Sequence, residues 1–158
     1  MEFISVGAAI SLTEWSESTF RRRIAEGSVK RKLEPGVNGR SMVDVESIQP
    51  HLCLALDEDD IALVKAADAG DPEAQTDLAL LFLAADKTKS ALYWLELAVK
   101  KEYANAMYYL SLCHIDGKGV PQDENLGLMW LARAAVHGSV IAQDHMQAVR
   151  DKLALSPA

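Results

Sequence analysis

The chain has 158 residues, with 16 Lys and Arg against 23 Asp and Glu, a formal net charge of -7 and 49% hydrophobic residues. This composition is typical of a globular protein and excludes the disordered, collagen-like and disulfide-scaffold classes. The longest uninterrupted apolar run, Leu78 to Ala85, is far shorter than the roughly 20 residues of a membrane-spanning helix, so no membrane partner is expected. The N-terminus places an acid, Glu2, where a signal peptide needs a base, which predicts a cytoplasmic protein.

The charge is unevenly distributed along the chain. Residues 1–50 contain seven basic and seven acidic residues, whereas residues 51–158 contain nine basic and sixteen acidic ones. All seven bases of the first part lie between Arg21 and Arg40, so a local positive surface can form on an acidic protein. We expect a domain over residues 1–52, a connector over 53–60 and a second domain over 61–158.

Two short helices, over residues 7–12 and 16–26, are predicted in the first domain. Ser16 is expected to cap the second helix and Gly27 to end it. Because side chains three and four positions apart share one face of a helix, this helix should bury Phe20 and expose Arg22.

A β-hairpin is expected next. Its strands lie over residues 29–33 and 40–45, and residues 34–39 join them. The pair Asn38-Gly39 favours a tight reversal because both residues tolerate positive φ.

A helix, a turn, an exposed helix and a basic hairpin are the elements of a winged helix-turn-helix. The stretch Thr13–Gly27, the hairpin and the closing segment Val43–Ile48 resemble the MerR and excisionase families over residues 3–52. Those families usually have glycine at the turn, where this chain has Glu14, and an aromatic residue at the place of Arg23. The resemblance implies that the exposed helix enters the major groove of double-stranded DNA while the hairpin contacts phosphates. The residues expected to contact DNA are Ser16, Ser18, Thr19, Arg21, Arg22, Lys30, Arg31, Lys32 and Arg40.

The same bases have a simpler interpretation as a solvated face. Arg23 in particular lies toward the core edge of its helix, where an ion pair with Glu26 or Glu34 would account for it.

An internal repeat occupies residues 61–150. An apolar stripe with i, i+4, i+7 spacing recurs three times, as Ala74/Leu78/Leu81, Ala106/Leu110/Cys113 and Ala142/Met146/Val149. A second triple, Ala91/Leu95/Ala98, recurs as Gly127/Leu131/Ala134, with Trp94 matched by Trp130. These patterns predict two kinds of helix in alternation.

The spacing of the repeat is 32 residues at one point and 36 at another, because the turn after the stripe containing Cys113 is longer. That turn contains Gly117 and Gly119, which tolerate positive φ. Asp71 followed by Pro72 predicts a helix start. The expected fold class is therefore mainly α, with a small winged helix-turn-helix and β-hairpin followed by a short α-solenoid of helix-turn-helix repeats.

Three segments, 67–74, 109–123 and 130–138, are similar to Sel-one-like repeats, relatives of tetratricopeptide repeats. The resemblance implies a solenoid that binds proteins rather than an enzyme. The last helix, over 142–153, is expected either to cap the array or to pair with a second subunit.

No catalytic residue, cofactor or metal is expected. The four histidines have no metal-ligand spacing, Cys53 and Cys113 lie sixty positions apart, and no phosphate loop or nucleophile motif is present.

The leading hypothesis is a DNA-binding transcriptional regulator, expected to be a homodimer, whose repeats bind a protein partner or a second copy. The alternative is an interaction adaptor that does not bind DNA, which the acidity of the repeats favours.

Overall fold

The computed structural model describes residues 2–35 and 39–155 and divides into two compact units, Met1–Ala69 and Gly70–Ala158. The boundary between the units lies after Ala69, whereas the sequence predicted a connector between the domains over residues 53–60. The difference concerns one helix, α4 (Glu58–Asp68), which the repeat pattern assigned to the second domain and which the structure packs with the first unit.

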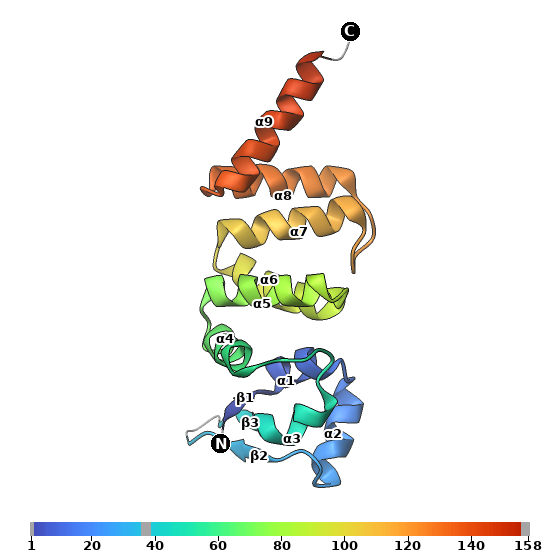
Figure 1. Cartoon of the computed structure of the whole chain (residues 1–158), viewed down its shortest axis with the longest axis vertical. Coiled ribbons are helices and arrows are strands. Elements are labelled where there is room, and N and C mark those ends of the chain that lie inside the picture. Colours follow the sequence, from blue (N-terminus) through green and yellow to red (C-terminus); the bar gives the residue numbers. More distant parts are fainter. Residues whose placement is uncertain (1, 36–38, 156–158) are drawn as a thin grey trace. The chain divides into compact units, whose positions relative to one another are not determined.

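The first unit has the expected order of helix, turn, helix and hairpin (Figure 1). Its elements are β1 (Phe3–Ser5), α1 (Val6–Thr13), α2 (Glu17–Ala25), β2 (Arg31–Leu33), β3 (Ser41–Asp44), α3 (Val45–Ile48), the 3-10 helix η1 (Gln49–His51) and α4. The strands form an antiparallel sheet in the order β1-β3-β2, with Ile4 opposite Val43 and Lys32 opposite Met42. Strand β1 was missed because three residues are too few to show alternation.

Glu14 forms the turn between α1 and α2, at the position where the resemblance implied glycine. Glu14 has φ 58 and its amide donates to the Ile10 carbonyl at 2.9 Å, so a non-glycine residue occupies the left-handed region. The predicted ends of α2 are confirmed: the Thr19 amide donates to Ser16 Oγ at 3.2 Å, and Gly27 follows the helix with φ 78. The predicted reversal includes Asn38, which lies outside the described residues.

Helix α4 is anchored to the start of α1 by hydrogen bonds. Asp68 accepts the Ser5 amide at 2.7 Å and the Ser5 hydroxyl at 2.5 Å, and Ser5 Oγ in turn accepts the Ala8 amide. Val64 is fully buried in the same unit. These contacts account for the position of the boundary, since a partly buried carboxylate with two donors is costly to release.

The second unit consists of α5 (Pro72–Ala84), α6 (Thr88–Lys100), α7 (Ala104–Asp116), α8 (Glu124–Val136) and α9 (Val140–Leu155). Helices α5 and α6 form one antiparallel pair, α7 and α8 form the next, and α9 packs on α8 (Figure 1). This alternation confirms the predicted solenoid. Asp71 caps α5, as expected, and Gly117 ends α7 with φ 69.

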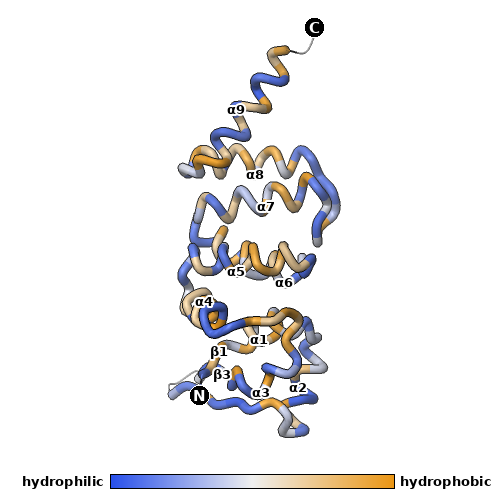
Figure 2. Tube along the Cα trace, in the orientation of Figure 1, coloured by the Kyte–Doolittle hydropathy of each residue, from blue (hydrophilic) through white to orange (hydrophobic). Residues whose placement is uncertain are grey.

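Matched small and large residues form the core of the helix pairs. Ala98 and Ala134, at equivalent positions of α6 and α8, are both fully buried, as are Leu95 and Leu131. Figure 2 shows hydrophobic residues concentrated along α5 to α8 and hydrophilic ones in the long turn between α7 and α8. No helix among the described residues is long and apolar enough to cross a bilayer.

Helix α9 differs from the first helices of the two pairs. Gln143 and Gln147 occupy the positions where α7 has Met107 and Ser111, which are buried. Gln147 instead hydrogen-bonds Asp151 on its own helix at 2.8 Å. Thus α9 presents polar side chains at two positions that α7 buries, while Val140, Ile141 and Leu153 are exposed elsewhere on the same helix. Whether α9 caps the array or pairs with a second subunit stays a prediction.

Candidate interaction surfaces

The predicted DNA-contacting residues of α2 lie at its exposed start and along its exposed side. Ser16 and Ser18 hydroxyls are 3.1 Å apart, and Ser16 Oγ also accepts the Thr19 amide, so this hydroxyl is engaged in capping the helix. Arg21 pairs with Glu17 at 3.6 Å and Arg22 with Glu26 at 3.9 Å. Both pairs are solvent-exposed, so each contributes little to stability and leaves the guanidinium accessible.

The hairpin divides its bases between two faces. Strand alternation places Arg31 on the face of the sheet that carries buried Val43, and Lys32 on the opposite face, where its ammonium lies 3.9 Å from the Phe3 ring centroid. Lys30 and Arg40 are exposed beside the strands. All six predicted cations are therefore exposed, but Arg31 and Lys32 lie on opposite faces of the sheet.

Arg23 has a different role from the one expected. Its guanidinium lies over the Trp15 ring at 5.2 Å, and it is Arg22, not Arg23, that pairs with Glu26. Trp15 also contacts Phe20 and His51. Arg23 thus packs in the aromatic cluster beside the turn.

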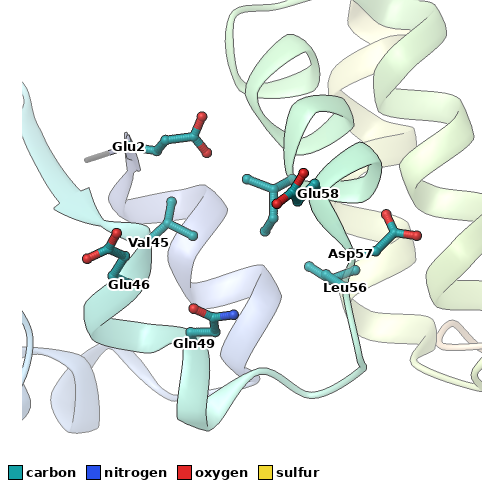
Figure 3. A pocket seen from close by; sticks show the side chains of 8 residues that line it. Glu2, Val45, Glu46, Gln49, Leu56, Asp57 and Glu58 are labelled. Atoms are coloured by element: carbon teal, nitrogen blue, oxygen red, sulfur yellow. The ribbon is translucent and has the colours of Figure 1, made fainter.

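A pocket of about 630 Å³ opens between α3, η1 and α4 in the first unit (Figure 3). It is lined by Glu2, Val45, Glu46, Gln49, Leu56, Asp57, Glu58 and Ile61. Two of its four carboxylates have structural partners: Asp57 accepts the Asp60 amide in a capping box, and Glu2 pairs with Lys65 at 3.4 Å.

In the second unit, one side of the first helices is open to solvent. Spacing of three to four residues places on it the side chains that we call the open face: Glu73 and Asp77 of α5, and Asn105, Tyr109 and Asp116 of α7. The three carboxylates are exposed, and Asn105 and Tyr109 are half-buried. Within the part of the chain that the structure describes, none of these carboxylates forms an ion pair.

Tyr103, the residue before α7, lies at the edge of the open face. Burial raises the pKa of its phenol, and the nearby carboxylates of Glu73, Asp77 and Asp71 raise it further, while a hydrogen bond with the Asn105 side chain acts in the opposite direction. Lys101 donates a hydrogen bond to the Gly70 carbonyl, so the turn that contains Tyr103 lies beside the start of α5. An aromatic ring and two carboxylates therefore border the same surface.

More aromatic rings continue the surface along α7 toward α9. Tyr108 and Tyr109 have ring centroids 5.2 Å apart, and Tyr108 contacts His145 of α9 edge-on at 6.0 Å. Burial raises the pKa of the Tyr108 phenol, and Tyr109 contributes to the same shift. These rings are held against one another and form a preorganised half-buried platform.

The sequence patterns predicted the helices of the repeats but indicated no binding role for the open-face residues. The sequence does contain a pattern that marks this surface. Two positions four residues apart, facing away from the apolar stripes, hold acids in α5 and a polar and an aromatic residue in α7. Cys113, which the apolar stripe of α7 predicted to lie in the core, is buried. Burial raises the pKa of its thiol, Lys118 lowers this pKa, and Asp116 raises it. The described residues contain no group of three or more His, Cys, Asp or Glu placed to hold a metal ion.

Comparison with a protein-family model identifies the helix pairs. Residues 72–103 and 104–139 each match the Sel1 repeat model, and these two spans contain α5/α6 and α7/α8. This confirms the Sel-one-like resemblance for the second unit. The MerR and excisionase resemblance of the first unit has no counterpart among the matches and stays a prediction.

Two solved structures resemble the repeat region. A Sel1 repeat protein from Oxalobacter formigenes is 38% identical over 55% of this chain and 26% of its own length, with a TM-score of 0.53. A protective antigen of uropathogenic Escherichia coli with an SLR fold is 28% identical over 56% of this chain and 20% of its own length, with a TM-score of 0.50. This chain thus spans about a quarter or less of either protein. No curated protein matches it.

Proposed function

We propose that the second unit is a protein-interaction module that binds a partner segment on its open face. The observation that carries the proposal is the pair of Sel1 repeats and the surface of their first helices. On this surface the carboxylates are exposed and a tyrosine is half-buried, so these side chains are accessible to a partner. Stacked helical repeats typically use such extended surfaces for binding. The adaptor hypothesis agrees with the match to the repeat model, whereas the regulator hypothesis also needs a surface on the first unit that binds DNA.

Tyr109 is the variant of choice for a binding test because it is central and half-buried. Tyr109→Ala is expected to weaken a purified partner's affinity about tenfold, since aromatic anchors near the centre of an interface contribute most to binding. The measurement is isothermal titration calorimetry with the full chain, after affinity purification has identified the partner. Tyr93→Phe on α6 is the matched control. An unchanged affinity for Tyr109→Ala, with circular dichroism equal to that of wild type, would contradict the proposal.

A second candidate function is DNA binding by the first unit. It is supported by the order α1, turn, α2 and hairpin together with the exposed positions of Arg21, Arg22 and Arg31. One such module reads few base pairs, so this candidate includes a homodimer on adjacent half-sites and the cytoplasmic location expected from the sequence.

If the first unit binds duplex DNA, charge removal at Arg22 should weaken the complex. Arg22→Ala is expected to lower affinity about fivefold, and affinity should fall steeply between 50 and roughly 200 mM salt because counterions are released from phosphates. Fluorescence anisotropy with genomic fragments at low salt measures both effects, and Lys65→Ala in α4 is the control. Absence of any complex at low salt would remove this candidate. A triple reversal of Arg21, Arg22 and Arg31 to Glu should leave partner binding by the repeats intact.

A further inference from the structure

The first helices of the two repeats have an unusual charge composition. Neither α5 nor α7 contains Lys or Arg, whereas α6, α8 and α9 all do. Glu73, Asp77 and Asp116 are exposed on the open face without an ion-pair partner among the described residues. The charged side chains of the open face are therefore all acidic, while the cations Lys101 and Lys118 lie in the turns before and after α7.

We propose that the open face binds an extended segment of a partner protein that presents Arg or Lys side chains, with the Tyr103 ring and the carboxylates of Glu73 and Asp77 receiving one cation. This inference rests on the proposed function and names the chemistry of the partner. Carboxylates attract the cation, and the aromatic face contacts it once water is displaced. Arg fits this combination best because its planar guanidinium stacks on a ring while hydrogen-bonding a carboxylate.

The α7 rings complete the site for such a segment. Tyr109, supported by its contact with Tyr108, offers apolar surface for the aliphatic stem of the cationic side chain or for a neighbouring residue. Asp116 lies about two turns beyond Tyr109 and places a third carboxylate at the end of α7. Acidic segments and nucleic-acid phosphates would meet like charge along this face, which disfavours them as ligands.

The probe for this inference is a blocked nonapeptide in which three Arg residues alternate with Ser-Gly pairs, compared with a second peptide in which Glu replaces each Arg. Titration into the ¹⁵N-labelled full chain at low salt is expected to shift the amides of Glu73, Asp77, Asn105 and Tyr109 with the Arg peptide only. The double variant Glu73→Gln/Asp77→Asn should weaken the Arg peptide at least fivefold, since two charges are lost with little change of shape. The matched control, Glu96→Gln/Glu124→Gln on the second helices, should change affinity less than twofold.

The inference is overturned if the Arg peptide shifts no open-face amide, if its shifts map only to the acidic residues 57–60, or if the Glu peptide produces the same pattern. Its failure is distinguishable from failure of the proposed function. A natural partner that depends on Tyr109 while the Arg peptide does not bind would sustain the interaction module and reject the cationic ligand. If the partner's affinity changes neither with Tyr109→Ala nor with Glu73→Gln/Asp77→Asn, the interaction module on the open face and its cationic ligand are both rejected.

Discussion

Replacing Trp94 with alanine is expected to lower the free energy of unfolding of the repeat unit by about 3–5 kcal/mol. Trp94 lies on α6 and is fully buried, the largest such side chain in the described part of the molecule. Its removal takes apolar contacts away and leaves a cavity that a close-packed helix stack refills poorly. Because small domains are stable by only about 5–15 kcal/mol, this change consumes much of the unit's stability. Urea unfolding followed by circular dichroism measures the effect.

Trp130 provides a control for this prediction within the same chain. It occupies the matching position of α8, yet it is only half-buried, and Arg133 lies over its ring at 4.8 Å. Trp130→Ala should therefore cost clearly less than Trp94→Ala, and Trp94→Phe should recover part of the loss. Equal losses at Trp94 and Trp130 would show that burial in the stack does not govern their contributions.

Gly127→Ala is expected to destabilise the repeat unit by about 1–3 kcal/mol, although alanine is the better helix former by about 1 kcal/mol. A Cβ at Gly127 would collide with the Ile115 side chain and lie 3.0 Å from the Ser111 carbonyl oxygen and 3.1 Å from the Ile115 amide nitrogen. Backbone atoms cannot rotate away, so α7 and α8 would have to separate. Thermal or urea unfolding of the full chain gives the change in free energy.

Two further variants separate steric crowding from helix propensity at this site. Ala91 is the counterpart of Gly127 in α6, where a methyl group is already accommodated and buried. Ala91→Gly should lower stability by about 1 kcal/mol, the usual cost of glycine in a helix. Ile115→Ala combined with Gly127→Ala should cost less than the sum of the single changes, because the deleted side chain makes room for the new methyl. A stabilising effect of Gly127→Ala alone would show that the helices are not in close contact there.

Much of the fold was predictable because its signals are local. The caps at Ser16 and Asp71 and the ends at Gly27 and Gly117 follow from neighbouring residues. The alternating helices followed from stripes that recur every 32 to 36 residues. Strand β1 was not predictable in this way, since it forms by pairing with β3, which is distant in the sequence. The left-handed Glu14 makes a local hydrogen bond to Ile10, but its residue type gives no signal because glycine is the usual residue in that conformation.

The candidate sites were less predictable than the helices that carry them. Charge clustering located the bases of the first unit, but only strand alternation in the folded sheet separates Arg31 from Lys32. The placement of Arg23 over Trp15 depends on the turn before α2, which holds the Trp15 ring against Phe20 and Arg23. For the repeats, the open face emerges only when it is known which helix sides are covered by neighbours.

The amino-acid sequence by itself determined the alternation of two helix types, their ends and the register of their apolar stripes, because periodicity and capping act over one or two turns. Tertiary structure alone decided that α4 packs with the first unit, that Trp94 is buried while Trp130 is half-exposed, and that α9 presents polar side chains at two positions that α7 buries. The physical reason is that burial is a property of neighbours: the same residue type at matched repeat positions is enclosed or partly hydrated according to the side chains that adjacent helices bring against it.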